Sequence, residues 1–270
     1  EFRDMRAVYG ELPVMRYPAA KDCGPQYIRG IAEWADDGTF AGSKQALWLI
    51  YCVNKEDLWV SRVPLPVKPD ETEFPTDDWA KATPGGVVPG WNLYSPKWAP
   101  ATVVEKAGKR SLELRDGDPF DYARALRVFP ETAQVRVELD VTPEQANGRL
   151  ELELCDGGGR RPVRVMLTET GTVQATDAKG VTDLAKYAAG ETVSLLITAD
   201  AAASRYRVQV NGGAARELAM AEAEAKTLQR LSLRTGIWRG LPNEKVDPAA
   251  DVPLPNPTVF QVHRVKIAAP

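Results

Sequence analysis

Residues 27–63 contain three apolar segments separated by polar turns, and they indicate a small antiparallel β-sheet. The segments read YIRGIA at 27–32, ALWLIY at 46–51 and LWVSR at 58–62. The charged tetrapeptide NKED, at 54–57, separates the second segment from the third by a length that suits a hairpin. Short apolar or alternating runs bounded by turn residues are typical of strands joined by hairpins. Residues 1–66 are therefore expected to form a sheet of three or four strands, which is too small to be stable without a partner surface.

A longer series of predicted strands fills residues 91–270. Many short alternating strands with Gly, Pro and Asp turns between them indicate a sandwich or jelly roll. In RVELDV at 136–141 and RLELEL at 149–154, apolar and charged residues alternate, so each strand should bury one face and expose the other. The predicted strands are 110–114, 123–128, 134–141, 148–154, 163–168, 172–176, 192–199, 204–211, 228–235 and 258–268.

The residues between these two regions, 67–90, are rich in proline and acidic residues and lack periodicity. Such a composition predicts a linker. Phe74 and Trp79 are unusual in a free linker, so they are expected to pin it to a neighbouring surface.

One segment of the larger region carries conflicting signals. Asn211-Gly212 favours a tight turn with positive φ between two strands. The following residues, 214–226, are rich in Ala, Glu, Leu and Met, and their propensity favours a helix. The strand pattern instead requires a returning strand at 216–220, followed by a short helical turn at 221–226. Both interpretations stay open, and the strand is preferred because sheet context often overrides propensity.

The first three segments resemble the last propeller blade of bacterial sialidase-like (BNR-repeat) proteins that act on polysaccharides. The hairpin over 190–212 and the closing strand FQVHRVKI at 260–267 resemble concanavalin-type, laminin-G-like jelly rolls. The resemblance implies an all-β protein: a jelly-roll sandwich preceded by a small antiparallel blade-like sheet. It also implies a place in glycan metabolism, with a polysaccharide or oligosaccharide as ligand and upstream propeller blades as a partner.

Composition excludes several function classes. The net charge is −3, which gives no electrostatic basis for binding nucleic acid or an anionic membrane. No apolar run approaches the roughly 20 residues that cross a bilayer. The chain opens at Glu1 without a methionine, so a lost upstream segment with a secretion signal is expected. We therefore expect a secreted or periplasmic protein.

Cysteine and histidine are too few for common catalytic or metal centres. Three widely spaced cysteines argue against a disulfide framework and against a zinc site. His263 is the only histidine, so a multi-histidine metal site is excluded. It is expected on the polar face of the last strand, where the alternation shifts phase before Val265.

Catalytic candidates lie in the N-terminal region: Arg29, Glu33, Glu56 and Asp57. By the resemblance, sialidase-like enzymes use arginines to hold substrate carboxylates and carboxylates or a tyrosine for the chemistry. The alternative is that 54–57 is a solvated hairpin turn and that Arg29 pairs locally with Glu33, since charge runs usually face solvent. One blade cannot assemble a propeller active site, so the chain alone is expected to be inactive.

Aromatic candidates for stacking on sugar rings are Trp91, Tyr94, Trp98 and Trp238. Aromatic faces stack on the apolar faces of sugars. The competing interpretation is that these side chains are core, because clustered aromatics are more often buried than ligand-binding.

Three carboxylates within six residues, Asp116, Asp118 and Asp121, are candidate calcium ligands. The spacing departs from an EF-hand, and a solvated turn before the next strand explains the same residues.

These observations favour a glycan-associated accessory or carbohydrate-binding region of a secreted polysaccharide-degrading protein. Two other hypotheses remain: part of a sialidase-like glycoside hydrolase or polysaccharide lyase whose other blades are absent from this chain, or a purely structural module.

Overall fold

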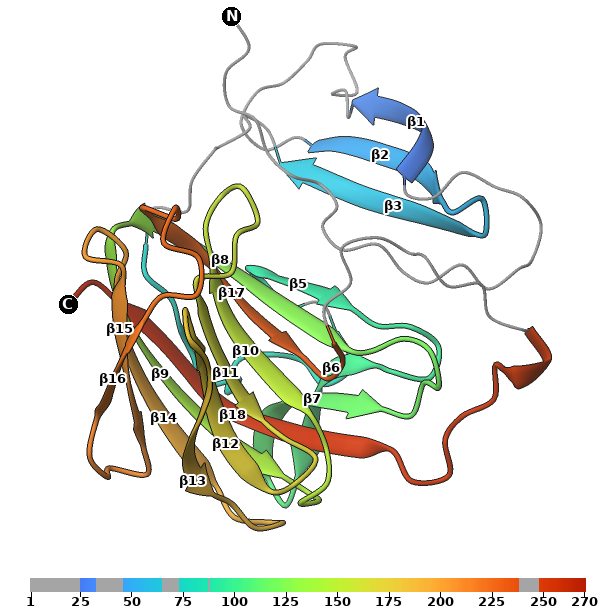
Figure 1. Ribbon diagram of the computed structural model, residues 1–270. Helices are drawn as coiled ribbons and strands as arrows, with labels where there is room; N and C mark the ends of the chain where they lie inside the picture. The colour runs from blue at the N-terminus through green and yellow to red at the C-terminus, as the bar shows by residue number, and fades with distance from the viewer. Residues whose placement is uncertain (1–24, 33–45, 65–72, 87, 238–247) are drawn as a thin grey trace, which may run out of the picture. The chain divides into compact units, whose positions relative to one another are not determined.

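The computed structural model describes residues 25–32, 46–64, 73–86, 88–237 and 248–270 (Figure 1). Within them the regular structure is β-strand, apart from a short 3-10 helix, η2 (Pro248–Ala250). The described residues form two compact units, one with strands β1–β3 and η2, the other with strands β4–β18. The predicted all-β fold class is confirmed. No helix among these residues is both long and apolar enough to cross a bilayer.

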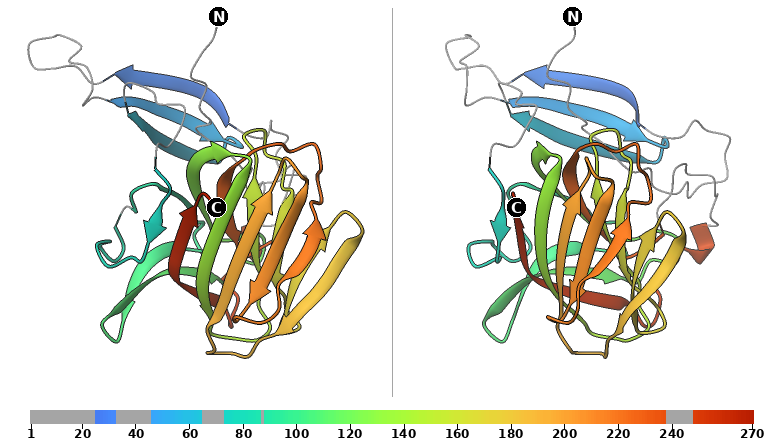
Figure 2. Two further views of the ribbon diagram at one scale, coloured as in Figure 1. Left: turned by 90° about the vertical axis from the view of Figure 1, so that its left-hand side faces the viewer. Right: turned by 60° about the vertical axis from the view of Figure 1, so that its left-hand side comes forward.

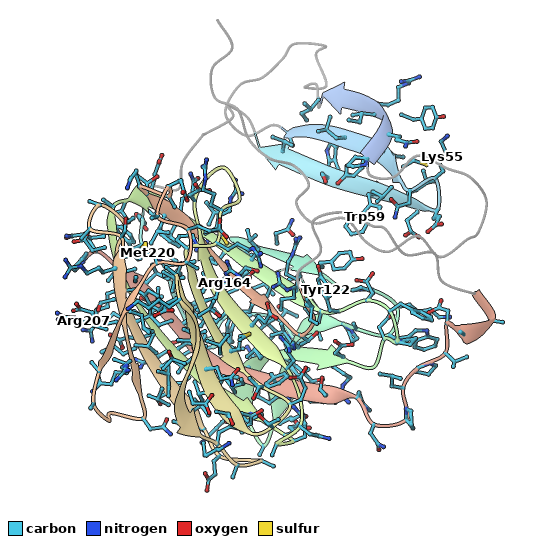
Figure 3. The ribbon with its side chains drawn as sticks, viewed as in Figure 1. Lys55, Trp59, Tyr122, Arg164, Arg207 and Met220 are labelled. Carbon is cyan, nitrogen blue, oxygen red and sulfur yellow. The ribbon has the colours of Figure 1, made fainter. Side chains whose placement is uncertain are left out.

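The smaller unit is a three-stranded antiparallel sheet in the order β1-β2-β3. Its strands are β1 (Pro25–Ala32), β2 (Ala46–Val53) and β3 (Asp57–Pro64). Asn54 and Lys55 both have positive φ, and the Glu56 amide donates to the Val53 carbonyl at 3.0 Å. This is a type I′ turn, whose twist matches that of a hairpin. Lys55 lies at its tip (Figure 3).

The larger unit is a sandwich of two antiparallel sheets, seen from two sides in Figure 2. The first sheet has the order β13-β12-β11-β10-β17-β8-β5. The second has the order β16-β15-β14-β9-β18-β7-β6, with β4 also paired to β18. Their bounds are β4 (Thr76–Asp77), β5 (Trp91–Tyr94), β6 (Ala101–Lys106), β7 (Lys109–Asp116), β8 (Arg124–Thr132), β9 (Gln134–Pro143), β10 (Leu150–Cys155), β11 (Val163–Leu167), β12 (Thr172–Asp177), β13 (Gly180–Lys186), β14 (Val193–Asp200), β15 (Arg205–Val210), β16 (Arg216–Ala219), β17 (Leu228–Arg234) and β18 (Thr258–Ala268).

The core lies between the two sheets and follows the alternation of the strands. In β9 the side chains of Val135, Val137 and Leu139 are buried, whereas the residues between them face outward. Strand β10 differs from the expectation, because all six of its residues are buried. Its outward-facing Glu151 and Glu153 are covered along with the apolar residues of the strand.

Strand β18 crosses the centre of the second sheet and contains a β-bulge. Its register against β9 shifts between Val262 and Arg264, so His263 is the extra residue. The shift in alternation seen in the sequence around His263 corresponds to this bulge.

The segment after the β14–β15 hairpin is a strand. Asn211 and Gly212 have φ of 50° and 70°, and the Gly213 amide donates to the Val210 carbonyl at 2.9 Å. Strand β16 then returns and pairs with β15, as the strand pattern requires. Residues 221–226 form a turn and irregular backbone, so the helix that propensity favours is absent from this described segment.

The described part of residues 67–90 is built into the sandwich. β4 pairs with β18, and the side chains of Trp79 and Val88 lie in the core at 4% and 5% exposure. Phe74 packs on the same core and lies 6.4 Å from Phe129 between ring centres. The described residues of this segment therefore form part of the sandwich: they add a short strand beside β18 and contribute side chains to the core.

Candidate functional site

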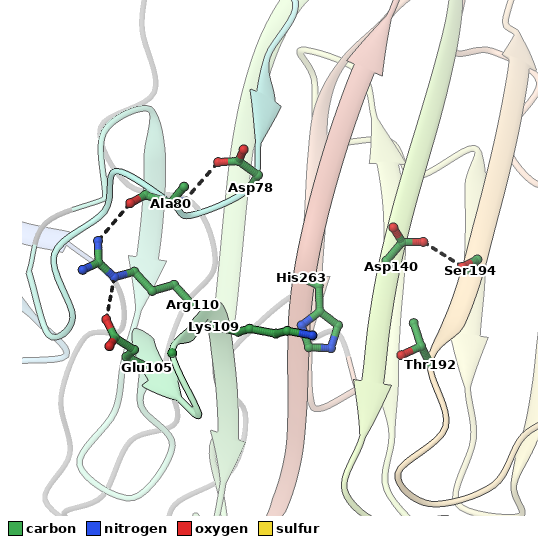
Figure 4. Close-up of a pocket in the computed structure, with 10 residues that line it drawn as sticks. Asp78, Ala80, Glu105, Lys109, Arg110, Asp140, Thr192, Ser194 and His263 are labelled. Atoms are coloured by element: carbon green, nitrogen blue, oxygen red, sulfur yellow. Dashed lines mark hydrogen bonds and ion pairs between the residues drawn. The ribbon is translucent and has the colours of Figure 1, made fainter.

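An open trough crosses the outer face of the second sheet. Its main part has a volume of about 900 Å³, and a smaller part of about 170 Å³ continues it, sharing Asp140 and Ser194. The main part is drawn in Figure 4. It is lined by Asp78, Ala80, Glu105, Gly108, Lys109, Arg110, Asp140, Thr192, Ser194 and His263. These residues come from strands β6, β7, β9, β14 and β18 and from adjoining turns.

Outward-facing side chains of neighbouring strands bond to one another along the trough floor. Asp140 on β9 accepts hydrogen bonds from Ser194 Oγ at 2.7 Å and from Arg264 Nε at 3.0 Å. His263 Nε2 lies 2.8 Å from Thr142 Oγ1, which is also 2.8 Å from Thr192 Oγ1. The bulge in β18 places the imidazole on the outer face beside these groups. The floor therefore holds hydroxyl, imidazole and carboxylate groups in fixed positions.

The charge in the trough is mixed. Burial lowers the pKa of His263, and the Lys109 ammonium adds to this while Asp140 opposes it, so the imidazole is neutral at pH 7. Arg110 is held by Glu105, with Nε 2.9 Å from Oε2. Lys109 is exposed and extends along His263 (Figure 4). Among the described residues Lys109 has no carboxylate partner, so it is the cation of the trough that can receive an anionic group.

The predicted sugar platforms Trp91 and Tyr94 are largely buried. Trp91 is 8% exposed, packs 5.4 Å from Trp79 between ring centres, and donates from Nε1 to Asp77 at 3.0 Å. Tyr94 is 6% exposed. Neither ring offers a free face to a sugar. Trp98 is half-buried, with the Lys97 ammonium 4.1 Å above its ring. Trp238 lies outside the described residues.

A row of stacked aromatic and guanidinium groups lies on the outer face of the first sheet. The rings of Tyr94 and Tyr122 meet edge to face with centres 6.3 Å apart. Arg124 stands 5.8 Å from the Tyr94 ring, and Arg234 stands 5.7 Å from the Tyr122 ring. All four side chains are buried. Since a ligand cannot reach buried groups, this row is structural support in the conformation described.

A buried ion cluster continues this row. Arg234 is fully buried and donates to Glu151 and, at 3.0 Å, to Glu153. Arg161 bonds the other oxygen of Glu153 at 2.8 Å, and Arg149 bonds Glu151 at 2.8 Å. Each carboxylate is thereby shared by two guanidinium groups. In the sequence, the charged residues of RLELEL at 149–154 are the part of this cluster that could be noticed, and we had expected them to face solvent.

The three predicted calcium ligands are engaged in local hydrogen bonds. Asp116 accepts from the Asp118 amide at 3.1 Å and from Thr235 Oγ1 at 2.7 Å. Asp118 Oδ1 accepts from the amides of Phe120 and Asp121. Asp121 accepts from the Tyr122 amide and from the Tyr94 hydroxyl. Across the described ranges no group of three or more acidic, histidine or cysteine side chains is arranged to hold a metal ion. The other oxygen of Asp118, Oδ2, is buried without a hydrogen-bond partner among the described residues. The calcium role of the three aspartates stays a prediction.

The predicted catalytic residues of the smaller unit lie on its strands and turn. Arg29 is exposed on β1 and donates to the carbonyl of its neighbour Ile28 at 3.2 Å. Glu56 belongs to the β2–β3 turn, and Asp57 starts β3. Glu33 lies outside the described residues. The catalytic role of these residues stays a prediction.

The two sheets and the trough define a β-sandwich module that presents an open polar surface on one sheet face. Residues 91–251, more than half of the chain, match a protein family described as "Sialidase-like, CBM domain". The chain belongs to this family, whose members are carbohydrate-binding modules of sialidase-like proteins.

Two solved structures illustrate the relationship. A protein described as a sialidase is 31% identical, with a TM-score of 0.80 over 97% of this chain and 24% of its own length. This chain therefore spans about a quarter of that sialidase. The apo form of the Crh5 transglycosylase is 16% identical, with a TM-score of 0.51 over 72% of this chain and 83% of its own, a likeness of fold alone. No curated protein sequence matches the chain.

Proposed function

We propose that this chain binds a glycan in the trough of the second sheet and serves as the accessory region of a larger protein. The observation that carries the proposal is an open trough of about 900 Å³ on a member of a carbohydrate-binding-module family. Its floor presents Asp140, Ser194, Thr192 and His263, whose groups both donate and accept hydrogen bonds. Sugar hydroxyls need that combination of partners.

The trough favours a glycan with a carboxylate. Lys109 supplies an ammonium group beside the neutral imidazole of His263, and a carboxylate on a uronate-type sugar would complete the pairing. The trough is open and mostly lined by polar groups, so its binding energy must come from hydrogen bonds to groups that water also solvates. We therefore expect weak binding, in the millimolar to micromolar range, or roughly 4–8 kcal/mol.

The role of the whole protein follows from the resemblance to the longer sialidase. In this proposal the parent is a secreted or periplasmic glycoside hydrolase or polysaccharide lyase, and the module keeps it near its polymer. Bond cleavage is assigned to parts outside this chain, because the chain aligns with only 24% of the length of the matched sialidase.

Affinity electrophoresis through gels containing uronate-bearing and neutral polysaccharides tests the proposal. The wild-type chain should be retarded by at least one uronate polymer. Lys109→Ala and His263→Ala should reduce the retardation. Arg207→Ala is the matched control, since Arg207 lies on the outer face of the same sheet, outside the trough and 64% exposed in its side chain. Equal effects of Lys109→Ala and Arg207→Ala would mean that the trough is not the site.

A structural module is the second candidate. The observation that favours it is that no Trp, Tyr or Phe is among the described residues that line the trough, whereas sugar sites commonly use one. Unchanged mobility across a broad polysaccharide panel would make this the better account.

A further inference from the structure

The trough contains an imidazole, the kind of side chain whose charge ordinarily changes between pH 5 and pH 8. It belongs to His263, the only histidine of the chain. The bulge in β18 places this half-buried ring on the outer face of the second sheet, where it lines the trough. The charge of the trough can therefore change at a single known position near neutral pH.

The imidazole lies near one cation and one carboxylate. From β7 the charged group that faces it is Lys109, which extends along the ring (Figure 4). From β9 it is Asp140, whose carboxylate is already engaged by Ser194 at 2.7 Å and by Arg264 at 3.0 Å. Strand β14 contributes the uncharged side chains of Thr192 and Ser194. The other charged residues that line the trough are Asp78, Glu105, Arg110, Arg136, Glu138 and, on β18 itself, Arg264.

The chain on its own disfavours a charged imidazole. Burial lowers the pKa of His263, and the Lys109 ammonium lowers it further, while Asp140 opposes both effects. Protonation would place a second positive charge beside Lys109. A ligand carboxylate near both groups would reverse this balance, because an opposite charge within about 4–6 Å favours the charged form.

The contact between His263 and Thr142 is compatible with both charge states. Thr142 Oγ1 lies 2.8 Å from Nε2 of the ring. A hydroxyl can donate to a neutral ring nitrogen or accept from a protonated one. Its other neighbour, Thr192 Oγ1 at 2.8 Å, is also a hydroxyl and can reverse its role in the same way. The ring can thus gain a proton without losing its partner on the trough floor.

We propose that the trough takes up one proton, at His263, together with a carboxylated glycan, so that binding strengthens as the pH falls. The proton comes from the solvent and is held on a ring nitrogen. The glycan carboxylate stays ionised and pairs with both the imidazolium and the Lys109 ammonium. This inference rests on the proposed function, because it needs an acidic glycan in the trough, and it adds the charge state in which the site holds that glycan.

Proton NMR tests the uptake directly, since the only histidine of the chain gives a single set of imidazole resonances. The chain is prepared without a histidine tag. Oligosaccharides of galacturonate, glucuronate, mannuronate and guluronate are the probes, each beside its carboxyl-reduced neutral form. In the chain alone, the pKa of His263 should lie below its ordinary value of 6.5. A bound uronate should raise this pKa by about 1 or more, whereas the neutral form should leave it unchanged.

Calorimetry at pH 8 and pH 6 measures the affinity for the same probes. The wild-type chain should bind a uronate about threefold or more tightly at pH 6 than at pH 8. His263→Gln keeps a donor and an acceptor but cannot gain a charge, so its affinity should be equal at the two pH values. Arg207→Ala is the matched control outside the trough and should follow the wild type.

Two results would overturn the inference and leave glycan binding in place. One is a pKa of His263 that a bound uronate does not change. The other is an equal gain in affinity toward pH 6 in the wild type and in His263→Gln. Failure of every uronate to bind at either pH would overturn the proposed function and this inference together.

Discussion

The hydroxyl of Tyr94 donates a hydrogen bond of 2.6 Å to Oδ2 of Asp121, and both side chains are buried. Tyr94 ends the edge strand β5, whereas Asp121 lies in the loop between β7 and β8. From the sequence we had considered one as a sugar platform and the other as a calcium ligand. Their contact instead gives a buried carboxylate a donor and ties the edge of the first sheet to that loop.

Tyr94→Phe should therefore reduce the stability of the larger unit. A buried hydrogen bond to a charged group contributes about 1.5–3 kcal/mol, and its loss leaves the carboxylate of Asp121 with one donor fewer. Urea denaturation followed by tryptophan fluorescence measures the change in the free energy of unfolding. Tyr27→Phe is the control, because Tyr27 is 65% exposed. A similar loss in both variants would show that the contact contributes little.

Arg234→Met should destabilise the larger unit more strongly. Removing one member of a buried ion cluster costs about 3–5 kcal/mol, because the charges of Glu151 and Glu153 stay buried with fewer partners. The control is Arg207→Met, which breaks an exposed pair with Glu217 and should change stability by less than about 1 kcal/mol. Thermal denaturation and denaturant titration of the two variants distinguish buried from exposed pairing. Equal shifts would mean that the cluster around Arg234 is solvated in solution.

The fold could be predicted because its strands alternate. The Val and Leu positions of β9 face the core as their spacing requires, and the break in alternation at His263 marked the bulge in β18. The Asn-Gly pair specified its turn through local backbone chemistry alone. Each of these signals is contained within about ten residues, so no knowledge of the tertiary structure was needed.

The candidate site could not be predicted in the same way, because distant parts of the chain build it. Lys109, Asp140, Ser194 and His263 meet only after four strands align. Arg234 meets Glu151 across 83 positions. Aromatic residues give the same sequence signal whether they bind a sugar or fill a core, and the burial of Trp91 and Tyr94 depends on which strands cover them.

Trp91→Ala should destabilise the larger unit by about 3–5 kcal/mol, the usual cost of deleting a buried aromatic side chain. The variant loses its packing against Trp79 and the hydrogen bond to Asp77. Trp98→Ala should cost less, since Trp98 is only half-buried. Calorimetry of the two variants measures the difference. If Trp91→Ala melted like the wild type while losing glycan binding, the prediction that Trp91 is a sugar platform would be supported and its structural role contradicted.

Asp116→Asn should gain stability relative to the wild type as the pH rises from 4 to 7. Burial raises the pKa of Asp116 to about 6 from 3.8. The negative charges of Asp118 and Asp121 add to this increase, whereas hydrogen bonds from Thr235 and from the Asp118 amide oppose it. A carboxyl whose pKa is higher in the folded state stabilises folding fully below its unfolded pKa, and this stabilisation is lost as the pH rises through about 6.

Asparagine at position 116 cannot ionise, so the variant lacks this loss. The free energy of unfolding of Asp116→Asn minus that of the wild type should therefore rise between pH 4 and pH 7, by about 3 kcal/mol at most. Taking the difference at each pH removes the contributions of the other titrating groups. Glu113 is one of them: burial raises the pKa of its carboxyl, but hydrogen bonds from Lys106, Gln261 and Arg115 outweigh this and lower it. Any change in hydrogen bonding to Thr235 adds a constant that does not vary with pH. A difference that stays flat from pH 4 to pH 7 would show that Asp116 titrates as an ordinary solvated carboxyl.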